Sequence, residues 1–266
     1  MIGAIIGDVA GSRFEWNNIK TKDFRLFHPD CRVTDDSVMS LALARAVLDC
    51  GGDFDKLPEY AVARMQELGR RYPHAGFGGR FREWLRMDNP APYNSFGNGS
   101  AMRVSPAGFA ARSLEEAKEL SEKVTAVTHN HPEGLKGAEA TAMAIRLARE
   151  GKDKEEIQDY IHRNYYPMDF TLEEIRPEYE FDVSCQGSVP QALKAFFESA
   201  GFEDAIRNAI SIGGDSDTIA AICGSVAEAY YGVPELLALQ VKNYLTDDLL
   251  EILERFEEKH PGNDTD

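Results

Sequence analysis

The chain has 266 residues, enough for one large domain or two small ones and for a sizeable buried core. Lysine and arginine number 29 against 45 aspartate and glutamate residues, which gives a formal net charge of -16. This balance argues against nucleic acid or an anionic membrane surface as the main partner. It does not exclude a small phosphorylated ligand, since metal ions and helix N-termini can form a local anion site in an acidic protein.

Helical periodicity, with apolar residues at spacings of three and four, recurs along the whole chain. It predicts helices over residues 36–49, 57–71, 77–87, 114–127, 139–149, 152–163, 189–199, 203–210, 218–231, 234–242 and 247–259. We expect a Pro-Glu-Gly break at residues 132–134, and only residues 179–184 alternate like a short strand. The pattern therefore predicts an all-α fold, a multi-helix bundle without fixed-period repeats.

No linker rich in proline, serine or glycine divides the chain, so we expect a single domain over residues 1–259 and a polar C-terminal tail at residues 260–266. The N-terminal stretch lacks the basic and apolar regions of a signal peptide. No stretch approaches the roughly 18 to 20 apolar residues that a membrane span requires. A cytoplasmic location is the expectation. Neither a zinc knuckle nor a disulfide framework is indicated, because no C-x-x-C pair occurs among Cys31, Cys50, Cys185 and Cys223.

Two acidic clusters, far apart in the sequence, each open a long Ala-rich apolar segment. They are Thr34-Asp35-Asp36-Ser37 and Gly213-Gly214-Asp215-Ser216-Asp217-Thr218. Adjacent acids repel one another, and the partial positive charge of a helix N-terminus offsets only part of that repulsion. Their carboxylate and hydroxyl oxygens suit Mg²⁺, Mn²⁺ or Ca²⁺ better than zinc or copper. Helix capping is the alternative interpretation, but capping needs one oxygen and each cluster supplies two acids. We therefore favour a metal centre where the two helix starts meet.

Two further segments contain small and polar residues that packing explains poorly. In residues 7–15, glycines would let the opening helix touch another backbone, and Glu15 either reaches the same metals or is an ordinary surface acid. Residues 93–103 are dense in glycine, asparagine and serine, so their backbone N–H groups can face an anion. An ordinary mobile loop is the alternative there. No Walker A sequence follows and no strand precedes, which excludes the common nucleotide-binding fingerprints.

Histidine and glycine motifs occur at two more places. His129 and His131 alternate in residues 128–132, and in a site of hard oxygen ligands we do not expect either to bind metal. One of them is expected to contact a phosphate or sugar, with a structural role as the alternative. Residues 186–190 read as a loop entering a helix with Pro190 in its first turn, and they serve either substrate contact or capping alone.

Over nearly the whole chain, the order of these motifs resembles the ADP-ribosylglycohydrolase family, which includes the dinitrogenase-reductase-activating glycohydrolase and the ADP-ribosyl-acceptor hydrolases. The resemblance rests on Gly7-Asp8 with Phe14-Glu15, Thr34-Asp35-Asp36-Ser37, Gly97-Asn98-Gly99 with Ala101-Met102-Arg103, Thr128-His129, and Gly213-Gly214-Asp215-Ser216-Asp217-Thr218. It implies a single-domain orthogonal multi-helix bundle with a dinuclear cleft, two Mg²⁺ or Mn²⁺ ions near its base, and an ADP-ribosyl substrate.

Carried over by position, the resemblance implies two sets of metal ligands that share one residue. One ion would be bound by Thr34, Asp35, Asp36 and Asp217. The other would be bound by Asp215, Asp217, Thr218 and Glu15, so that Asp217 bridges the two ions. The implied ADP-ribose channel is lined by Asn94, Ser95, Phe96, Gly97, Asn98, Gly99 and Ser100, with His129 and Met102 nearby.

The resemblance implies a metal-dependent hydrolase that releases ADP-ribose from an ADP-ribosylated arginine or serine side chain or from a small conjugate. Cleavage of a ribosyl C1 bond passes through an oxocarbenium-like state, which is favoured when the ribose hydroxyls are fixed and a water is activated beside C1. Asp35 and Glu15 are the two candidates for the proton-handling group, and the sequence does not choose between them.

Two rival functions remain open at this point. A non-catalytic ADP-ribose-binding protein on the same scaffold is one, although all the required acids are present. A phosphoryl-transfer enzyme is the other, because Asp215-Ser216-Asp217-Thr218 is similar to the D-x-D motif of haloacid dehalogenase-type phosphatases. That motif needs an apolar strand and a parallel sheet, and the sequence predicts neither.

Overall fold

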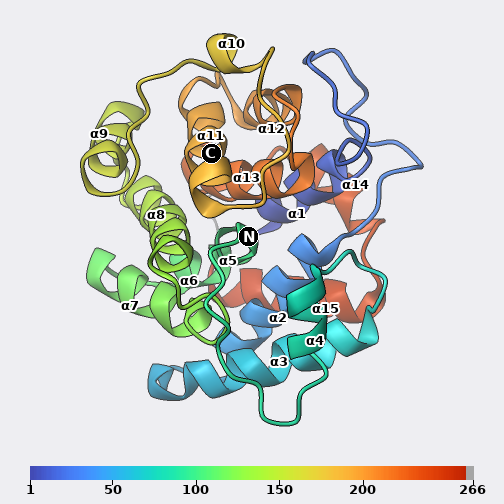
Figure 1. The fold of residues 1–266 in the computed structure, drawn as a ribbon, viewed down its shortest axis with the longest axis vertical. Coiled ribbons are helices and arrows are strands. Elements are labelled where there is room, and N and C mark those ends of the chain that lie inside the picture. Colours follow the sequence, from blue (N-terminus) through green and yellow to red (C-terminus); the bar gives the residue numbers. More distant parts are fainter. Residues whose placement is uncertain (262–266) are drawn as a thin grey trace.

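Helix α13, Ser216–Tyr231, crosses the middle of the molecule and is buried from Ser216 to Ala229 (Figure 1). The computed structural model describes residues 1–261. Around α13 lie α1 (Ile2–Gly11), α2 (Asp35–Asp49), the short 3-10 helix η1 (Phe54–Lys56), α3 (Leu57–Arg71), α4 (Gly79–Trp84), α5 (Gly99–Met102), α6 (Ser105–Ala110), α7 (Leu114–Thr125), α8 (Pro132–Arg149), α9 (Lys154–Asn164), α10 (Leu172–Ile175), α11 (Cys185–Phe197), α12 (Phe202–Ser211), α14 (Glu235–Lys242) and α15 (Asp247–Lys259). The predicted all-α fold is confirmed.

Helix α1 packs against α13 with their backbones nearly touching. A Cβ atom placed on Gly7 would lie 2.0 Å from the carbonyl oxygen of Ala220, and one placed on Gly11 would lie 2.6 Å from the Cα of Asp217. Residues four apart share one face of a helix, so only a glycine face on α1 permits this approach. Because Asp8 lies between Gly7 and Gly11, this contact places Asp8 next to the first turn of α13.

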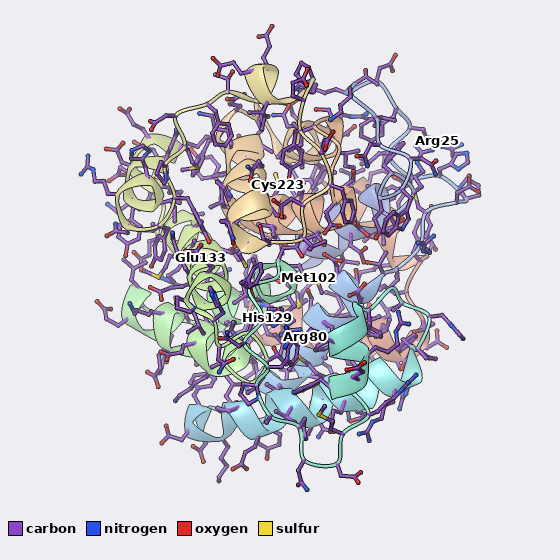
Figure 2. The ribbon with its side chains drawn as sticks, in the orientation of Figure 1. Arg25, Arg80, Met102, His129, Glu133 and Cys223 are labelled. Carbon is purple, nitrogen blue, oxygen red and sulfur yellow. The ribbon has the colours of Figure 1, made fainter. Side chains whose placement is uncertain are left out.

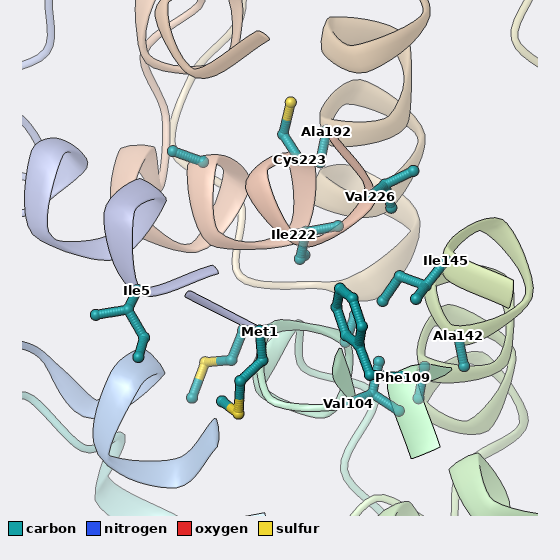
Figure 3. Packing of buried hydrophobic residues seen from close by; sticks show 14 of the residues in the cluster. Met1, Ile5, Val104, Phe109, Ala142, Ile145, Ala192, Ile222, Cys223 and Val226 are labelled. Atoms are coloured by element: carbon teal, nitrogen blue, oxygen red, sulfur yellow. The ribbon is translucent and has the colours of Figure 1, made fainter. Parts of the chain in front are cut away.

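The core surrounds α13 on its other sides. Met102, at the end of α5, lies near the centre of the molecule (Figure 2). Figure 3 shows Phe109 of α6 among Ile222 of α13 and Ile145 of α8, all buried. This packing fixes α13 rigidly and so fixes the direction in which its N-terminal acids point.

Every predicted helix occurs, but three local predictions were wrong. Residues 132–134 begin α8 instead of breaking it, because Pro132 occupies the first turn, where a missing N–H is harmless, and His131 Nδ1 accepts from the Glu133 N–H at 3.1 Å. Residues 179–184 do not form a strand, and one antiparallel bridge links Ser184 to Gly97. The predicted helix over residues 77–87 is shortened to Gly79–Trp84, and the one over 189–199 begins earlier, at Cys185. Residues 186–190 are therefore helical and not a loop, and Pro190 lies inside α11 beyond its first turn, because Ser184 caps the helix by accepting from the Gly187 N–H at 3.1 Å.

Within residues 1–261, no helix combines the length and apolar character that crossing a bilayer requires. The last helix ends at Lys259, and most of the predicted polar tail, residues 262–266, lies outside the described residues.

Candidate metal centre

A cavity of about 430 Å³ lies where the starts of α2 and α13 meet α5 and the loop before α11. Five acidic residues line it, together with residues of the glycine-rich loop and several cationic or aromatic side chains. The acids are Glu15, Asp35, Asp36, Asp215 and Asp217. The expectation that the two helix starts come together is thereby confirmed.

Asp8 of α1 holds the start of α2 in place. Its Oδ1 accepts from the Thr34 hydroxyl at 2.6 Å, while its Oδ2 accepts from the backbone N–H groups of Thr34 and Ser37, each at 3.1 Å, and from the Ser37 hydroxyl. Asp8 is fully buried, and burial raises its pKa although these hydrogen bonds lower it in part. With so many donors on its oxygens, Asp8 acts chiefly as an anchor for α2.

Thr34 caps α2, as the alternative interpretation of this cluster expected. Its Oγ1 accepts from the Asp36 N–H at 3.3 Å and donates to Asp8. Thr34 is buried beneath the cavity wall and does not line the cavity. Capping therefore explains Thr34, but it does not explain why the carboxylates of Asp8, Asp36 and Asp217 lie so close together.

Asp8, Asp36 and Asp217 form the first acidic group, with one carboxylate oxygen from each within 4.8 Å of the others. Burial, followed by repulsion from Asp8 and Asp35, raises the pKa of Asp36 well above its ordinary value. The Oδ1 atom of Asp36 is buried and has no hydrogen-bond donor within the described residues. An unpartnered carboxylate oxygen among other acids is strongly unfavourable unless a cation compensates it, so the donor set fits a divalent ion.

Glu15, Asp215 and Asp217 form the second group at the same spacing. Asp217 belongs to both groups, in agreement with a bridging position. Burial, then repulsion from Asp36 and Asp215, raises the pKa of Asp217 well above its ordinary value. Asp215 is steadied by Asn98, whose Nδ2 donates to Asp215 Oδ2 at 2.7 Å. Thr218 also lines the cavity, beside these acids.

Asp35 lies beside the two groups but belongs to neither. Its Oδ1 occupies the space over Gly76, 2.8 Å from where a Cβ atom on that glycine would be. Its backbone N–H donates to the Ala75 carbonyl at 3.0 Å, which ties the start of α2 to this loop. Burial, followed by repulsion from Asp8, raises the pKa of Asp35 to about 7. Asp35 can therefore exchange a proton near neutral pH.

The predicted substrate channel is only partly on the cavity wall. The predicted channel residues that line the cavity are Ser95, Gly97, Asn98, Gly99, Met102 and His129. Three others do not line it. The backbone N–H of Asn94 donates to the Asn130 side-chain oxygen, Phe96 stands 48% exposed beside His131, and the Ser100 hydroxyl donates to the buried Gly134 carbonyl at 2.8 Å. In residues 186–190, Ser188 accepts from Asn98 Nδ2 at 3.0 Å, so this segment supports the channel from behind.

Several cavity residues were missed by reasoning from the sequence. Trp16 and Phe181 stack with ring centroids 5.1 Å apart, although their loops are far apart in the chain. Arg80 also lines the wall, beside Tyr93, the first residue of the segment 93–103 described above. Asp8 was recognised only as part of a motif. The sequence places a tryptophan directly after Glu15, and this could have indicated a ligand contact. Phe181 gave no such indication, because it lay in the segment wrongly predicted to be a strand.

Comparison with known proteins gives a consistent result. The chain is 26% identical to the ADP-ribosylhydrolase ARH3 of Homo sapiens, over 94% of this chain and 90% of that protein. It is 28% identical to the ADP-ribosylarginine hydrolase Tri1 of Pseudomonas putida, over 88% and 70%. It is 27% identical to the ADP-ribosyl-[dinitrogen reductase] glycohydrolase of Rhodospirillum rubrum, over 77% and 71%.

A solved structure, described as an ADP-ribosylglycohydrolase-related protein complex, has the same fold, with a TM-score of 0.64 and 24% identity over 91% of this chain and 95% of that one. The family model for ADP-ribosylglycohydrolase matches residues 1–265. Sequence motifs, helical fold and family model agree, and this chain belongs to the ADP-ribosylglycohydrolase family.

Proposed function

We propose that this protein is a metal-dependent hydrolase that cleaves the ribosyl C1 linkage of ADP-ribosylated side chains, arginine or serine, or of small ADP-ribose conjugates. The observation that carries the proposal is the pair of acidic groups sharing Asp217 beside a cavity with a glycine-rich wall. The relatives named above are hydrolases of ADP-ribosyl linkages, which supports the same reaction here.

Two divalent ions, Mg²⁺ or Mn²⁺, are proposed as the cofactors. The geometry supports Asp36, Asp215, Asp217 and Glu15 most directly as their ligands, because these acids and the anchoring Asp8 form the two groups. The full proposed set adds Thr34, Asp35 and Thr218 at the edges of those groups. When bound, such ions fix ribose hydroxyls and lower the pKa of bound water.

The protein's own residues would bind and orient the substrate. Gly97 and Gly99 leave the cavity wall without side chains, so a phosphate can approach the backbone there. Asp35 is the better placed of the two candidate proton carriers because its pKa lies close to neutral. Burial and repulsion from Asp215 also raise the pKa of Glu15, which keeps Glu15 as the second candidate.

A panel of linkages tests this proposal. Arginine-, serine-, O-acetyl- and nucleic-acid-linked ADP-ribose are incubated with the protein in Mg²⁺ and in Mn²⁺, and free ADP-ribose is quantified. We expect turnover of at least one linkage and a loss of about a hundredfold or more in Asp217→Ala, the scale of removing an electrostatic stabiliser of a transition state. Full activity of Asp217→Ala would refute the two-metal assignment.

An ADP-ribose binding measurement and an aryl phosphate ester, added to this panel, separate the alternatives. Tight binding of ADP-ribose without turnover of any linkage would favour a non-catalytic binding protein on this scaffold. Hydrolysis of an aryl phosphate ester that depends on Asp215 would favour the phosphatase interpretation. That interpretation lacks its scaffold in residues 1–261, which contain helices and one isolated bridge but no parallel sheet.

A further inference from the structure

Arg103 is a buried cation without an anionic partner. Only 2% of its surface is exposed, and across residues 1–261 no carboxylate oxygen lies within 4.0 Å of its guanidinium. Instead, Nη2 donates to the Thr128 hydroxyl at 2.6 Å and to His129 Nδ1 at 3.2 Å, and Cζ lies 5.1 Å from the Phe81 ring centroid. Burial lowers the pKa of Arg103 to about 10, so it stays charged at neutral pH. A buried charge of this kind is unfavourable until a counter-charge arrives.

The hydrogen bonds of Arg103 also determine the tautomer of His129. A guanidinium can only donate, so His129 Nδ1 must accept and cannot carry a proton. The Thr128 hydroxyl, 2.7 Å from the same nitrogen, is free to donate to it because it accepts from Arg103. Burial, and secondarily the charge of Arg103, lowers the pKa of His129 well below its ordinary value. The ring is therefore neutral, with its proton on Nε2.

The protonated nitrogen faces the glycine-rich wall of the cavity. His129 Nε2 lies 3.5 Å from where a Cβ atom on Gly99 would be and 3.7 Å from the corresponding position on Gly97. His129 and Arg80 line the same cavity, and Tyr93 lies beside both, with its ring centroid 6.0 Å from that of His129. Arg80 stacks over Tyr93, 5.0 Å from its ring centroid, and also has no carboxylate partner within the described residues. The cavity thus holds two guanidinium groups, Arg103 buried and Arg80 exposed, and neither forms an ion pair with the five acids on its wall.

We propose that Arg103 is a positioning residue: it holds His129 as a neutral Nε2–H donor toward Gly97 and Gly99 and supplies the counter-charge for the diphosphate of the ligand, with Arg80 as a second cation at the same wall. The diphosphate part of this inference rests on the function proposed above. The tautomer part does not depend on that function, because it follows from hydrogen bonds within the protein alone.

Binding measurements test the charge. Calorimetric titrations in Mg²⁺ compare ADP-ribose with adenosine, which lacks the diphosphate, for wild type, Arg103→Met, Arg103→Lys and Arg146→Met. We expect Arg103→Met to weaken ADP-ribose binding about tenfold or more, about 1.4 kcal/mol, without changing adenosine binding, and Arg103→Lys to recover part of the loss. Arg146 is the matched control, since it pairs with Glu150 and does not line the cavity.

Nitrogen NMR of the histidine rings tests the positioning. We expect wild type and Thr128→Val to show His129 protonated on Nε2 alone, because Arg103 still donates to Nδ1, and Arg103→Met to show a mixture of tautomers. If Arg103→Met does not fold, Arg103→Gln replaces it in both assays, because glutamine removes the charge and its amide can either donate to or accept from His129 Nδ1.

Each outcome decides something distinct. Unchanged ADP-ribose binding in Arg103→Met, or a single Nε2–H tautomer in that variant, would overturn the inference while leaving the proposed hydrolase intact. If wild type binds no ADP-ribose under any condition, the proposed function fails, and the tautomer experiment still decides the role of Arg103 beside His129.

Discussion

Asp8 and Asp36 are buried carboxylates of one acidic group, yet their oxygens are used very differently. Asp8 accepts hydrogen bonds from Thr34 and Ser37 through both oxygens, whereas Asp36 keeps Oδ1 without any donor in the described part of the chain. The first residue is therefore held by the protein, and the second is available to a ligand. Replacing each by its amide should separate these roles, since the shape is preserved and only charge and hydrogen bonding change.

Asp36→Asn should stabilise the metal-free protein and weaken its metal binding. Removing one charge relieves repulsion among buried acids by on the order of 1 kcal/mol, the size of one pKa unit. Loss of a ligand should lower Mn²⁺ affinity at least about tenfold, since even partners outside the ligand shell contribute that much. Denaturant unfolding in EDTA and Mn²⁺ titration measure the two effects. Wild-type Mn²⁺ affinity in this variant would contradict the assignment of Asp36 as a ligand.

Asp8→Asn should have the opposite effect on the metal-free protein. With the amide nitrogen in the Oδ2 position, the backbone N–H groups of Thr34 and Ser37 lose their acceptor. With it in the Oδ1 position, the Thr34 hydroxyl must turn to Asp36 Oδ2, 3.2 Å away, and the hydrogen bonds that remain lose the negative charge that strengthens them. We expect a loss of about 1–3 kcal/mol in unfolding free energy. The same denaturation assay provides the comparison with Asp36→Asn. Equal stability of Asp8→Asn and wild type would show that the anchoring role is wrong.

Among the elements, the contact between α1 and α13 controls whether the acids meet. Gly7→Ala would place a methyl group 2.0 Å from the Ala220 carbonyl oxygen, so the helices must separate. We expect a loss of at least about 3 kcal/mol, the upper end of overpacking, because backbone cannot move aside as a side chain can. Metal binding should weaken as well, since Asp8 moves with α1.

Gly201→Ala is the matched control for that prediction. Gly201 precedes α12, has nothing within 4 Å of a Cβ position, and has an extended backbone with φ of 177°. Its replacement should change the midpoint of thermal unfolding little and leave Mn²⁺ affinity unchanged. A comparable loss in the two variants would mean that close helix contact is not what Gly7 provides.

The elements also show what the sequence can and cannot predict. Residues 57–71 and 247–259 were predicted with the bounds that the structure has, because their apolar spacing is local and strongly helical. Pro132 was misread because a proline both breaks helices and begins them, and the next turns alone decide which. The sequence offered no local sign that Ser184 pairs with a single residue of a distant loop.

For the site, the two acidic clusters at residues 34–37 and 213–218 were predictable because each repeats acids within a few residues. The pairing of Trp16 with Phe181, and of Arg103 with His129, joins segments whose local patterns say nothing of each other. The same holds for Asp35, which follows Thr34 directly but lies beside the two groups, with its Oδ1 over Gly76. Geometry across segments was needed to find these contacts.

At the scale of the whole molecule, the metal-free protein should become less stable as pH rises above 6.5. Burial and neighbouring acids raise the pKa of Asp35 to about 7 and those of Asp36 and Asp217 well above 3.8. The folded state then binds more protons than the unfolded chain, so stability falls as pH rises through these values. Below 6.5 the buried, neutral His129 acts in the opposite direction, because its pKa is lowered on folding.

Thermal unfolding between pH 6.5 and about 8.5, in EDTA and in saturating Mn²⁺, measures this dependence. We expect the melting temperature to fall with pH in EDTA and to lose that slope in Mn²⁺, where the cation keeps the acids ionised at every pH in this range. Parallel slopes in the two buffers would indicate that the buried acids do not bind the ion.

The distance along the chain between Asp36 and Asp217 has a consequence for biosynthesis. During translation, α1 and α2 leave the ribosome long before α13 is made, so the nascent protein exposes the glycine face of α1 and holds its early carboxylates without their counterparts. Tight retention of a divalent ion must wait until synthesis has passed α13. A prematurely terminated product would therefore be released without tightly bound metal and with the α13-binding face of α1 exposed. We expect chaperones and proteases to recognise that product.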